Sequence, residues 1–203
     1  MSSIDWNEHY ESGQPPWESG LPSSELGRVI AEEGIQPCRM IELGCGSGIN
    51  AVWLAGQGFD VTAVDFNELA IEKARRRAAS AGVAVRFVLA DVFDLPELDE
   101  PFPVFFDRGC YHAVRGVDAA AYVRSLVRVT APGSLGLILT GNARSGHEAG
   151  QGPPVVAEED FQAELEPAFE IVRLREFEFD EVEHIEARFL AWSCLVRRNE
   201  DRE

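Results

Sequence analysis

The sequence predicts an α/β fold in which a mostly parallel β-sheet carries helices on both faces. Apolar runs of strand length alternate with helical segments from about residue 39 to residue 139. This alternation is the pattern of βαβ units, whose crossover helices cover the two faces of a parallel sheet. The chain has 203 residues, of which 45% are apolar and 26% are charged, and this fits one globular domain over residues 1–203.

An N-terminal cap is predicted over residues 1–23, ahead of the first strand. Trp6 and Trp17 lie in this stretch, and aromatic side chains are costly to leave in water. We therefore expect the cap to be ordered. A helix follows from Ser24, because apolar residues recur at helical spacing until Gly34 ends the segment.

Strands and helices then alternate along the chain. The predicted strands cover residues 39–43, 61–64, 85–89, 103–106 and 135–139, and the helices between them cover 50–55, 67–80 and 119–129. Asn67 is a favourable N-cap for the second of these helices, and Gly82 closes it. The pair Pro132-Gly133 stops the third helix before the next strand.

The C-terminal part of the sequence departs from this alternation. Residues 141–157 form a stretch rich in Gly and Pro that exceeds ordinary connection length, which favours a lid over a bound substrate. A short helix is predicted at 158–165. Two strands at 171–179 and 188–196 have period-two patterning, and we expect them to pair antiparallel.

The most informative segment is the glycine-rich turn that connects Leu43, at the end of the first strand, to the following helix. Gly44, Gly46 and Gly48 let the backbone turn tightly and approach a ligand closely. The turn leads into a helix N-terminus, whose free N–H groups favour negative charge. Asp65 ends the second strand 21 positions after Gly44, where a carboxylate can accept both hydroxyls of a ribose. This combination predicts a nucleoside-binding site.

Further acidic residues follow the later strands. Asp91 comes after the third strand and Asp107 after the fourth. The carboxyl ends of parallel strands meet at one edge of the sheet, and ligands bind there, near the point where the strand order reverses. We therefore expect Gly44, Asp65, Asp91 and Asp107 to line one site. The alternative, in which a strand-end Asp only caps the next helix or forms a turn, stays open.

The spacing of the glycines discriminates between nucleoside cofactors. In the nicotinamide dinucleotide fingerprint the third glycine lies three residues after the second, whereas Gly48 lies two residues after Gly46. This spacing disfavours a nicotinamide-dependent reductase, and so does the second acidic position at Asp91.

Six short motifs are spread over most of the chain. They are Pro16-Trp17-Glu18-Ser19-Gly20, Glu42-Leu43-Gly44-Cys45-Gly46-Ser47-Gly48, Ala63-Val64-Asp65-Phe66, Leu89-Ala90-Asp91-Val92-Phe93, Phe106-Asp107-Arg108-Gly109 and Gly152-Pro153-Pro154-Val155-Val156. Together they resemble class I S-adenosylmethionine-dependent methyltransferases, and within these the small thiopurine/thiol methyltransferase-like group. The resemblance implies a three-layer Rossmann-like fold with a seven-stranded, mostly parallel sheet whose last strand is antiparallel.

The resemblance also implies S-adenosyl-L-methionine as the cofactor. The implied cofactor-binding residues are Trp17, Leu43, Gly44, Gly46, Gly48, Asp65, Phe66, Asp91, Val92, Asp107 and Arg108. Among them, Asp65 would hold the ribose hydroxyls, and Asp91 with the backbone of Val92 would recognise the adenine ring. Arg108 would contact the cofactor near its methionine carboxylate, and Trp17 would cover the site. The sequence departs from the thiopurine enzymes in having Asp rather than Glu at position 65.

Methyl transfer from a sulfonium requires a nucleophile aligned behind the methyl group, exclusion of water and, for some acceptors, removal of a proton. His112 and Tyr111 follow the Asp-Arg-Gly motif and are the candidates for a base or a substrate-orienting group. A thiol, with a pKa near 8.5, is partly ionised at neutral pH and needs no strong base. We therefore predict a methyltransferase acting on a thiol. The alternatives are an O- or N-methyltransferase of a small aromatic metabolite and a non-catalytic S-adenosylmethionine-binding module.

Charge and composition restrict the partners. The net charge of −17 disfavours nucleic acid and anionic membrane surfaces, because both require Lys and Arg to neutralise phosphates. No apolar run approaches the roughly 20 residues of a membrane span, and the N-terminus lacks a signal-peptide pattern. We expect a cytoplasmic monomer that acts on a small molecule. No metal is predicted, since Cys38, Cys45, Cys110 and Cys194 lack metal-ligand spacing and fit free thiols.

Overall fold

A computed structural model describes residues 6–12, 15–98, 100–146, 152–180 and 189–200. The helices are α1 (Trp6–Ser12), α2 (Ser24–Glu32), α3 (Ile49–Gly56), α4 (Glu68–Ala81), α5 (Cys110–Val129) and α6 (Glu158–Leu165), with a short 3-10 helix η1 (Ala143–Ser145). The strands are β1 (Arg39–Leu43), β2 (Asp60–Asp65), β3 (Arg86–Leu89), β4 (Phe102–Arg108), β5 (Thr130–Asn142), β6 (Val155–Val156), β7 (Phe169–Glu178) and β8 (Leu190–Arg198).

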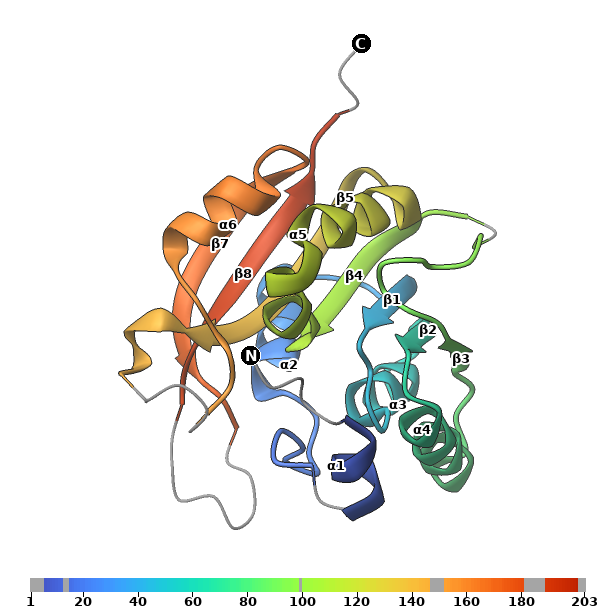
Figure 1. The fold of residues 1–203 in the computed structure, drawn as a ribbon. Helices are drawn as coiled ribbons and strands as arrows, with labels where there is room; N and C mark the ends of the chain where they lie inside the picture. Colours follow the sequence, from blue (N-terminus) through green and yellow to red (C-terminus); the bar gives the residue numbers. More distant parts are fainter. Residues whose placement is uncertain (1–5, 13–14, 99, 147–151, 181–188, 201–203) are drawn as a thin grey trace.

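One sheet contains all the strands, in the order β3-β2-β1-β4-β5-β8-β7, with the short β6 beside β5 (Figure 1). The pairs from β3 to β5 are parallel, and β8 is antiparallel to both of its neighbours. The predicted fold class is therefore confirmed, including the antiparallel last strand and the pairing of the two C-terminal strands. The order of the strands reverses between β1 and β4, which is where a ligand site is expected.

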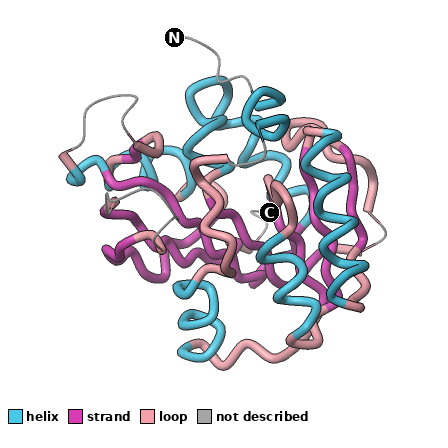
Figure 2. Tube along the Cα trace, turned by 90° about the horizontal axis from the view of Figure 1, so that it is seen from below, coloured by secondary structure: helices cyan, strands magenta, loops and turns pink. Residues whose placement is uncertain are grey.

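Helices cover both faces of the sheet and create two separate cores (Figure 2). Helices α5 and α6 contribute to one core, and α2, α3 and α4 contribute to the other. Adjacent residues of a strand enter opposite cores, as Phe105 and Phe106 of β4 do, and both are fully buried. A strand that is buried on both faces has no polar alternation, which is why these segments are continuous apolar runs in the sequence.

The structure differs most from the sequence-based boundaries at α5 and β5. Helix α5 begins at Cys110 rather than at 119, and it contains a kink at Asp118, where φ is −159° and ψ is 87°. Strand β5 runs from Thr130 to Asn142 and includes the exposed pair Pro132-Gly133. Parts of the predicted cap and lid, and the start of the predicted strand 188–196, lie outside the described residues.

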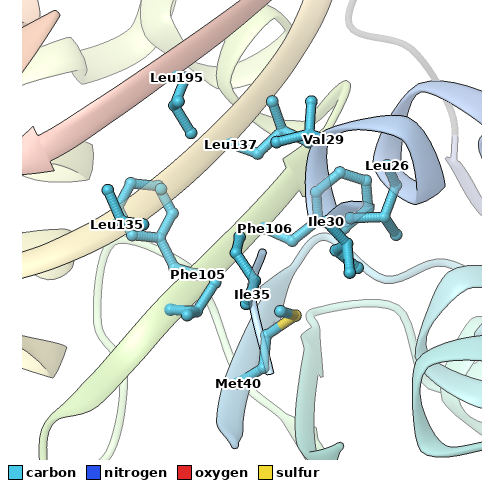
Figure 3. Close-up of a pocket in the computed structure, with 12 residues that line it drawn as sticks. Leu26, Val29, Ile30, Ile35, Met40, Phe105, Phe106, Leu135, Leu137 and Leu195 are labelled. Carbon is cyan, nitrogen blue, oxygen red and sulfur yellow. The ribbon is translucent and has the colours of Figure 1, made fainter. Parts of the chain in front are cut away.

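A small apolar cavity of about 10 Å³ lies between α2 and the sheet. Figure 3 shows Leu26, Val29 and Ile30 of α2 beside it, together with Phe106 and Leu137 from the strands. All of its lining side chains are apolar, and its volume is close to the minimum for one water molecule. The cavity is therefore a packing defect in the core and not a candidate for the nucleoside site.

Ion pairs fasten α2, which follows the N-terminal cap, to strand β7. The Glu25 side chain is only 3% exposed and pairs with Arg175 at 2.8 Å and with Arg28 at 2.6 Å. Arg175 also reaches Glu32 at 2.6 Å. At the end of β7, the Asp180 carboxylate accepts from the backbone N–H of Ser24 at 3.1 Å. These contacts fix the point at which the cap joins the rest of the fold.

Candidate active site

The glycine turn between β1 and α3 packs against its neighbours too closely for larger residues. Gly44 has a φ of 64° and Gly48 a φ of 77°, both in the left-handed region. A Cβ on Gly44 would lie 2.6 Å from the Cβ of Cys110, and one on Gly48 would lie 2.8 Å from the Cβ of Ala74. Glycine is therefore required by space as well as by backbone conformation. The turn brings the end of β1 directly against the start of α5.

Asp65 ends β2 beside this turn and is 7% exposed. Its carboxylate accepts from the backbone N–H of Gly46 at 2.8 Å and from that of Asn67 at 2.9 Å. Burial raises the pKa of Asp65 above its ordinary value, while these two hydrogen bonds oppose the rise. Each carboxylate oxygen keeps further acceptor capacity. The geometry places Asp65 where the sequence expects a ribose-binding acid.

The N-terminal cap is hydrogen-bonded to the glycine turn through Glu18. One Glu18 oxygen accepts from the backbone N–H of Ser47 at 3.2 Å, and the other accepts from the Ser47 hydroxyl at 2.8 Å. Lys73 of α4 donates to the carbonyl of Tyr10 in α1. The Tyr10 hydroxyl lies against Gly46, where an added Cβ would be 2.7 Å away. The cap therefore covers the carboxyl edge of the sheet.

Arg108, at the end of β4, contacts the same cap. Its Nη1 donates to the carbonyl oxygen of Trp17 at 2.9 Å, and its guanidinium lies 5.1 Å from the centre of the Phe179 ring. The Trp17 ring packs edge-on against Trp6 at 4.9 Å and His9 at 5.0 Å between centroids. The structure thus brings the Arg108 side chain and the Trp17 backbone together, and the contacts of both residues with the cofactor stay predictions.

The ends of β2 and β3 present an apolar surface to solvent. Phe66 is 57% exposed and Leu89 is 49% exposed, which is unusual for large apolar side chains next to a buried strand. Asp91 is exposed beside them, and one of its oxygens accepts from the backbone N–H of Phe93 at 2.9 Å. Val92 is buried. Apolar contacts beside a polar acceptor are what a purine ring requires.

Carboxylates of the protein itself satisfy the first amides of the glycine turn. Asp65 accepts from Gly46, and Glu18 accepts from Ser47, so these N–H groups are not free as the sequence suggested. A dinucleotide places its pyrophosphate on such amides, and two carboxylates there would repel it. Glu42 is also buried near this turn, and its Oε2 lacks a hydrogen-bond partner in the described part of the chain. The carboxylates of Asp65 and Glu18 therefore favour a nucleoside that carries positive charge and has no phosphate.

Asp107 has a structural role in place of the predicted cofactor contact. It is fully buried, and its carboxylate accepts from the backbone N–H groups of Cys110 and Tyr111 at 2.9 Å and from the Tyr122 hydroxyl at 2.6 Å. Burial raises its pKa to about 7, against the effect of these hydrogen bonds. Both oxygens cap α5 from within the core. The assignment of Asp107 to the cofactor is therefore corrected.

Tyr111 is likewise unsuited to the role of a base. Its ring is fully buried between Tyr122 and Phe161, and its hydroxyl donates to Glu164 of α6 at 2.6 Å. Burial, followed by this hydrogen bond to a negative group, raises the pKa of Tyr111 well above its ordinary value. The side chain joins α5 to α6 and does not offer a proton acceptor to a substrate.

His112 is also not a base at neutral pH. Its Nδ1 accepts a hydrogen bond from the backbone N–H of Gly141 in β5 at 3.0 Å. Burial, and then the positive charge of Arg108, lower its pKa to about 3. A base needs a free lone pair and a pKa near the working pH, so the structure contradicts this half of the prediction. The orienting role remains.

The family of the chain follows from comparison with known proteins. The sequence profile of the thiopurine S-methyltransferase family matches residues 1–200 of this chain. The chain belongs to the thiopurine S-methyltransferase family. A relative from Mycobacteroides abscessus, 2-heptyl-1-hydroxyquinolin-4(1H)-one methyltransferase, is 30% identical over 129 residues, which are 63% of this chain and 56% of that protein. Probable thiol methyltransferase 2 of Arabidopsis thaliana is 25% identical over 156 residues, 75% of this chain and 67% of the relative.

The matched region spans little more than half the length of the first of these relatives.

Solved structures of other proteins have the same fold as this chain. One, concerned with conversion of a disulfide bond into a thioacetal group during echinomycin biosynthesis, has a TM-score of 0.80 at 24% identity, over 94% of this chain and 86% of that chain. The N-methyltransferase NodS of Bradyrhizobium japonicum, in complex with S-adenosyl-L-homocysteine, has a TM-score of 0.67 at 18% identity, over 87% and 85%. For a thiopurine S-methyltransferase family member with this fold, S-adenosylmethionine is the indicated cofactor.

Two residues beside the glycine turn, Tyr10 and Glu18, could not be assigned a function from the sequence, although Glu18 lies in the motif Pro16-Trp17-Glu18-Ser19-Gly20. Glu18 and Tyr10 contact the glycine turn from about thirty positions upstream in the chain, and no local pattern predicts such a long-range contact. The four cysteines are free. Burial raises the pKa of Cys45 and of Cys110 well above its ordinary value, which favours the protonated, less nucleophilic form of both thiols.

Glu42 makes the stability of this family member depend on pH. Burial raises the Glu42 pKa to about 8, and the charges of Asp107 and Asp65 add to the rise. The folded chain therefore holds a proton that the unfolded chain releases near its ordinary pKa of 4.5. Stability is highest below that pKa and falls as the pH rises towards about 8, by up to about 1.4 kcal/mol per pH unit.

The variant Glu42→Gln is expected to remove this dependence. The reason is that the glutamine amide has no proton to lose. Denaturant unfolding at several pH values from about 5 to about 8 measures the dependence of stability on pH. Asp107 also has a raised pKa, about 7, and its charge acts on Glu42, so the difference between the two proteins measures Glu42 together with its coupling to Asp107. Parallel stability curves for the two proteins would show that Glu42 ionises normally.

Proposed function

We propose that this chain transfers the methyl group of S-adenosylmethionine to a small-molecule nucleophile, and that the nucleophile is a thiol. The observation that carries the cofactor assignment is the pair of carboxylates, from Asp65 and Glu18, on the amides of the glycine turn. These two carboxylates complement the sulfonium and ammonium charges of this cofactor and disfavour a pyrophosphate. The exposed Phe66 and Leu89 supply apolar contacts for its adenine.

The choice of a thiol is supported by the residues at the end of β4, because neither candidate among those that the structure describes there is suited to act as a base. Tyr111 is hydrogen-bonded to Glu164, and His112 is neutral with its Nδ1 occupied. A thiol is partly ionised in water near neutral pH and needs no base from the protein. A phenol, with a pKa near 10, needs more help. The name of the Arabidopsis relative also supports a thiol.

A second candidate is methylation of an acidic hydroxyl group on a small aromatic ring. The relative from Mycobacteroides abscessus is named for a 1-hydroxyquinolinone, and such a hydroxyl could also react without a base. A non-catalytic S-adenosylmethionine-binding module is the third candidate. It would bind the cofactor and transfer nothing, so turnover with any acceptor separates it from both enzymes.

In the proposed reaction the bound cofactor supplies an electrophilic methyl group, and the chain supplies position and shielding. Asp65 would hold the ribose hydroxyls, and Asp91 would accept from the adenine amino group. The cap, held by Glu18 on Ser47 and by Trp17 on Arg108, would exclude water from the methyl group. Exclusion of water and fixed alignment are the main contributions that a protein makes to such a displacement.

The experiment that tests this function is a methyl-transfer assay with matched acceptors. Benzenethiol, phenol and aniline share one ring and differ only in the nucleophilic atom. Transfer of a labelled methyl group is expected with the thiol, at a rate well above that with the phenol or the amine. Preference for the phenol would favour the second candidate. No transfer to any acceptor, with cofactor bound, would favour the binding module.

The N-terminal cap is expected to contribute to cofactor binding through Glu18. The variant Glu18→Ala removes both hydrogen bonds to Ser47, and we expect cofactor affinity to fall about tenfold, as for one lost charge-assisted bond of about 1.5 kcal/mol. Calorimetric titration measures the affinity. Glu11→Ala, an exposed glutamate of α1, is the control and should leave the affinity unchanged. Equal affinities for the two variants would show that the cap is not coupled to the cofactor.

The kind of acceptor, the cellular location and the oligomeric state are a further part of this proposal. The net charge of −17 is difficult to reconcile with nucleic acid as the acceptor. None of the helices in the described ranges combines the length and apolar character that a bilayer crossing requires. We propose a small, uncharged or locally paired acceptor, a cytoplasmic location and a monomeric state, which size-exclusion chromatography with light scattering can test.

A further inference from the structure

The hydrogen bond of His112 fixes which ring nitrogen carries the proton. Nδ1 lies 3.0 Å from the backbone nitrogen of Gly141, whose N–H can only donate. A neutral imidazole has one donor and one acceptor, so the proton of His112 is on Nε2. Gly141 is closely packed at the end of β5, because a Cβ there would lie 2.4 Å from the carbonyl oxygen of Pro154.

The His112 ring stays neutral, with its proton on Nε2, over the physiological pH range. Its neighbours come from the end of β4 and from β5, and the charged group among them is Arg108, whose positive charge opposes protonation. Burial acts in the same direction and lowers the His112 pKa to about 3. The side chain therefore offers an Nε2–H donor and no acceptor to anything bound beside it.

The Nε2 atom lies at the turn between β4 and α5, on the carboxyl edge of the sheet. An added Cβ on Gly109 would be 3.2 Å from Nε2 and 3.5 Å from Cε1 of His112. No hydrogen bond of Nε2 to another described residue is present, and the side chain is partly exposed. Arg108 precedes Gly109 on the same turn. A neutral donor and a fixed cation thus occupy one short segment. The acids that face Arg108 are Glu18, Glu42 and Asp180, and the Asp107 carboxylate caps the same turn from within the core.

We propose that His112 donates its Nε2–H to the methyl acceptor, and that the acceptor binds as an anion, a thiolate, stabilised by this donor. The inference rests on the proposed function and adds to it the ionisation state of the acceptor. The thiol loses its proton to solvent before transfer. The thiolate lone pair forms the new bond to the methyl carbon, the old carbon–sulfur bond breaks, and its electron pair stays on the cofactor sulfur, so the protein takes up no proton.

Two variants separate the donor from the structural contact of the ring. His112→Asn can keep an acceptor for Gly141 near the Nδ1 position but has no donor at the Nε2 position. His112→Gln can place an amide N–H near the Nε2 position. We expect the first variant to lose thiolate stabilisation and the second to restore it. Melting temperatures of both proteins control for a loss of packing.

The readout is the pH profile of kcat with a small alkanethiol. In the wild-type chain, the inflection is expected below the pKa of the same thiol free in solution, which is measured in parallel. His112→Asn should shift it upward by about one to two pH units, the size expected for one hydrogen bond to a charged group. His112→Gln should return it towards the wild-type position. Equal profiles for all three proteins would overturn the role of His112.

A base role would give a different result. It predicts a wild-type inflection near pH 6.5 that both variants abolish. No turnover of any thiol by the wild-type chain would overturn the proposed function itself, which distinguishes the two failures. A readout that needs no cofactor is NMR of the imidazole nitrogens. We expect one protonated Nε2 that does not titrate between about pH 5 and 8, and titration of His112 in that range would overturn the inference.

Discussion

Replacement of Asp65 by alanine is expected to weaken binding of S-adenosylmethionine by about 5- to 150-fold. The carboxylate ends β2 at the carboxyl edge and still has acceptor capacity beyond its bonds to Gly46 and Asn67. Two charge-assisted hydrogen bonds to ribose hydroxyls would be lost, which costs about 1–3 kcal/mol. Calorimetric titration of the variant gives the change in affinity directly.

The control for this experiment is Asp60→Ala, at the other end of the same strand. Asp60 is exposed, so its removal should leave both affinity and stability nearly unchanged. Asp65→Asn keeps one side-chain carbonyl and is expected to lie between the alanine variant and the wild type. Unchanged affinity in Asp65→Ala, in a protein that remains folded, would remove Asp65 from the cofactor site.

Replacement of Asp107 by alanine is expected to lower the free energy of unfolding by about 3–5 kcal/mol. Three donors, the Tyr122 hydroxyl and the N–H groups of Cys110 and Tyr111, would lose their buried acceptor. Each buried donor left without a partner costs about 1–3 kcal/mol, and loss of the helix cap is included in that cost. Denaturant unfolding measures the change.

Asp91→Ala is the matched comparison, because it also removes an acid that follows a strand at the same edge. Asp91 is exposed and accepts one backbone hydrogen bond, from Phe93. Its loss should cost less than about 1 kcal/mol of stability and should weaken cofactor binding. Equal losses of stability in the two variants would contradict the division between a capping acid and a binding acid.

The fold could be predicted from the sequence because its signals are local. Buried parallel strands are continuous apolar runs, and the glycines at 44, 46 and 48 mark the turn that follows the first of them. The start of α5 was missed, because Gly116-Val117-Asp118 interrupts the helical pattern at the kink. The extension of β5 was missed because Pro132 and Gly133 oppose a strand, and pairing with β4 and β8 overrides that preference.

The site could be predicted less well, because it depends on contacts between distant segments. An acid at the end of a strand has the same local sequence whether it binds a ribose, as proposed for Asp65, or caps a helix, as Asp107 does. Only Tyr122, fifteen residues further along α5, reveals the second role. The state of His112 depends on Gly141, twenty-nine residues away in β5. Physical chemistry fixes these roles only after the chain has folded.

The measurement that tests the account most directly is calorimetric titration of the wild-type chain with four ligands. These are S-adenosylmethionine, S-adenosylhomocysteine, the oxidised nicotinamide dinucleotide and its 2′-phosphorylated form. The carboxylates of Asp65 and Glu18 on the turn amides predict micromolar binding of the two sulfur nucleosides and no binding of either dinucleotide. Binding of a dinucleotide with no binding of S-adenosylmethionine would contradict the assignment of the site.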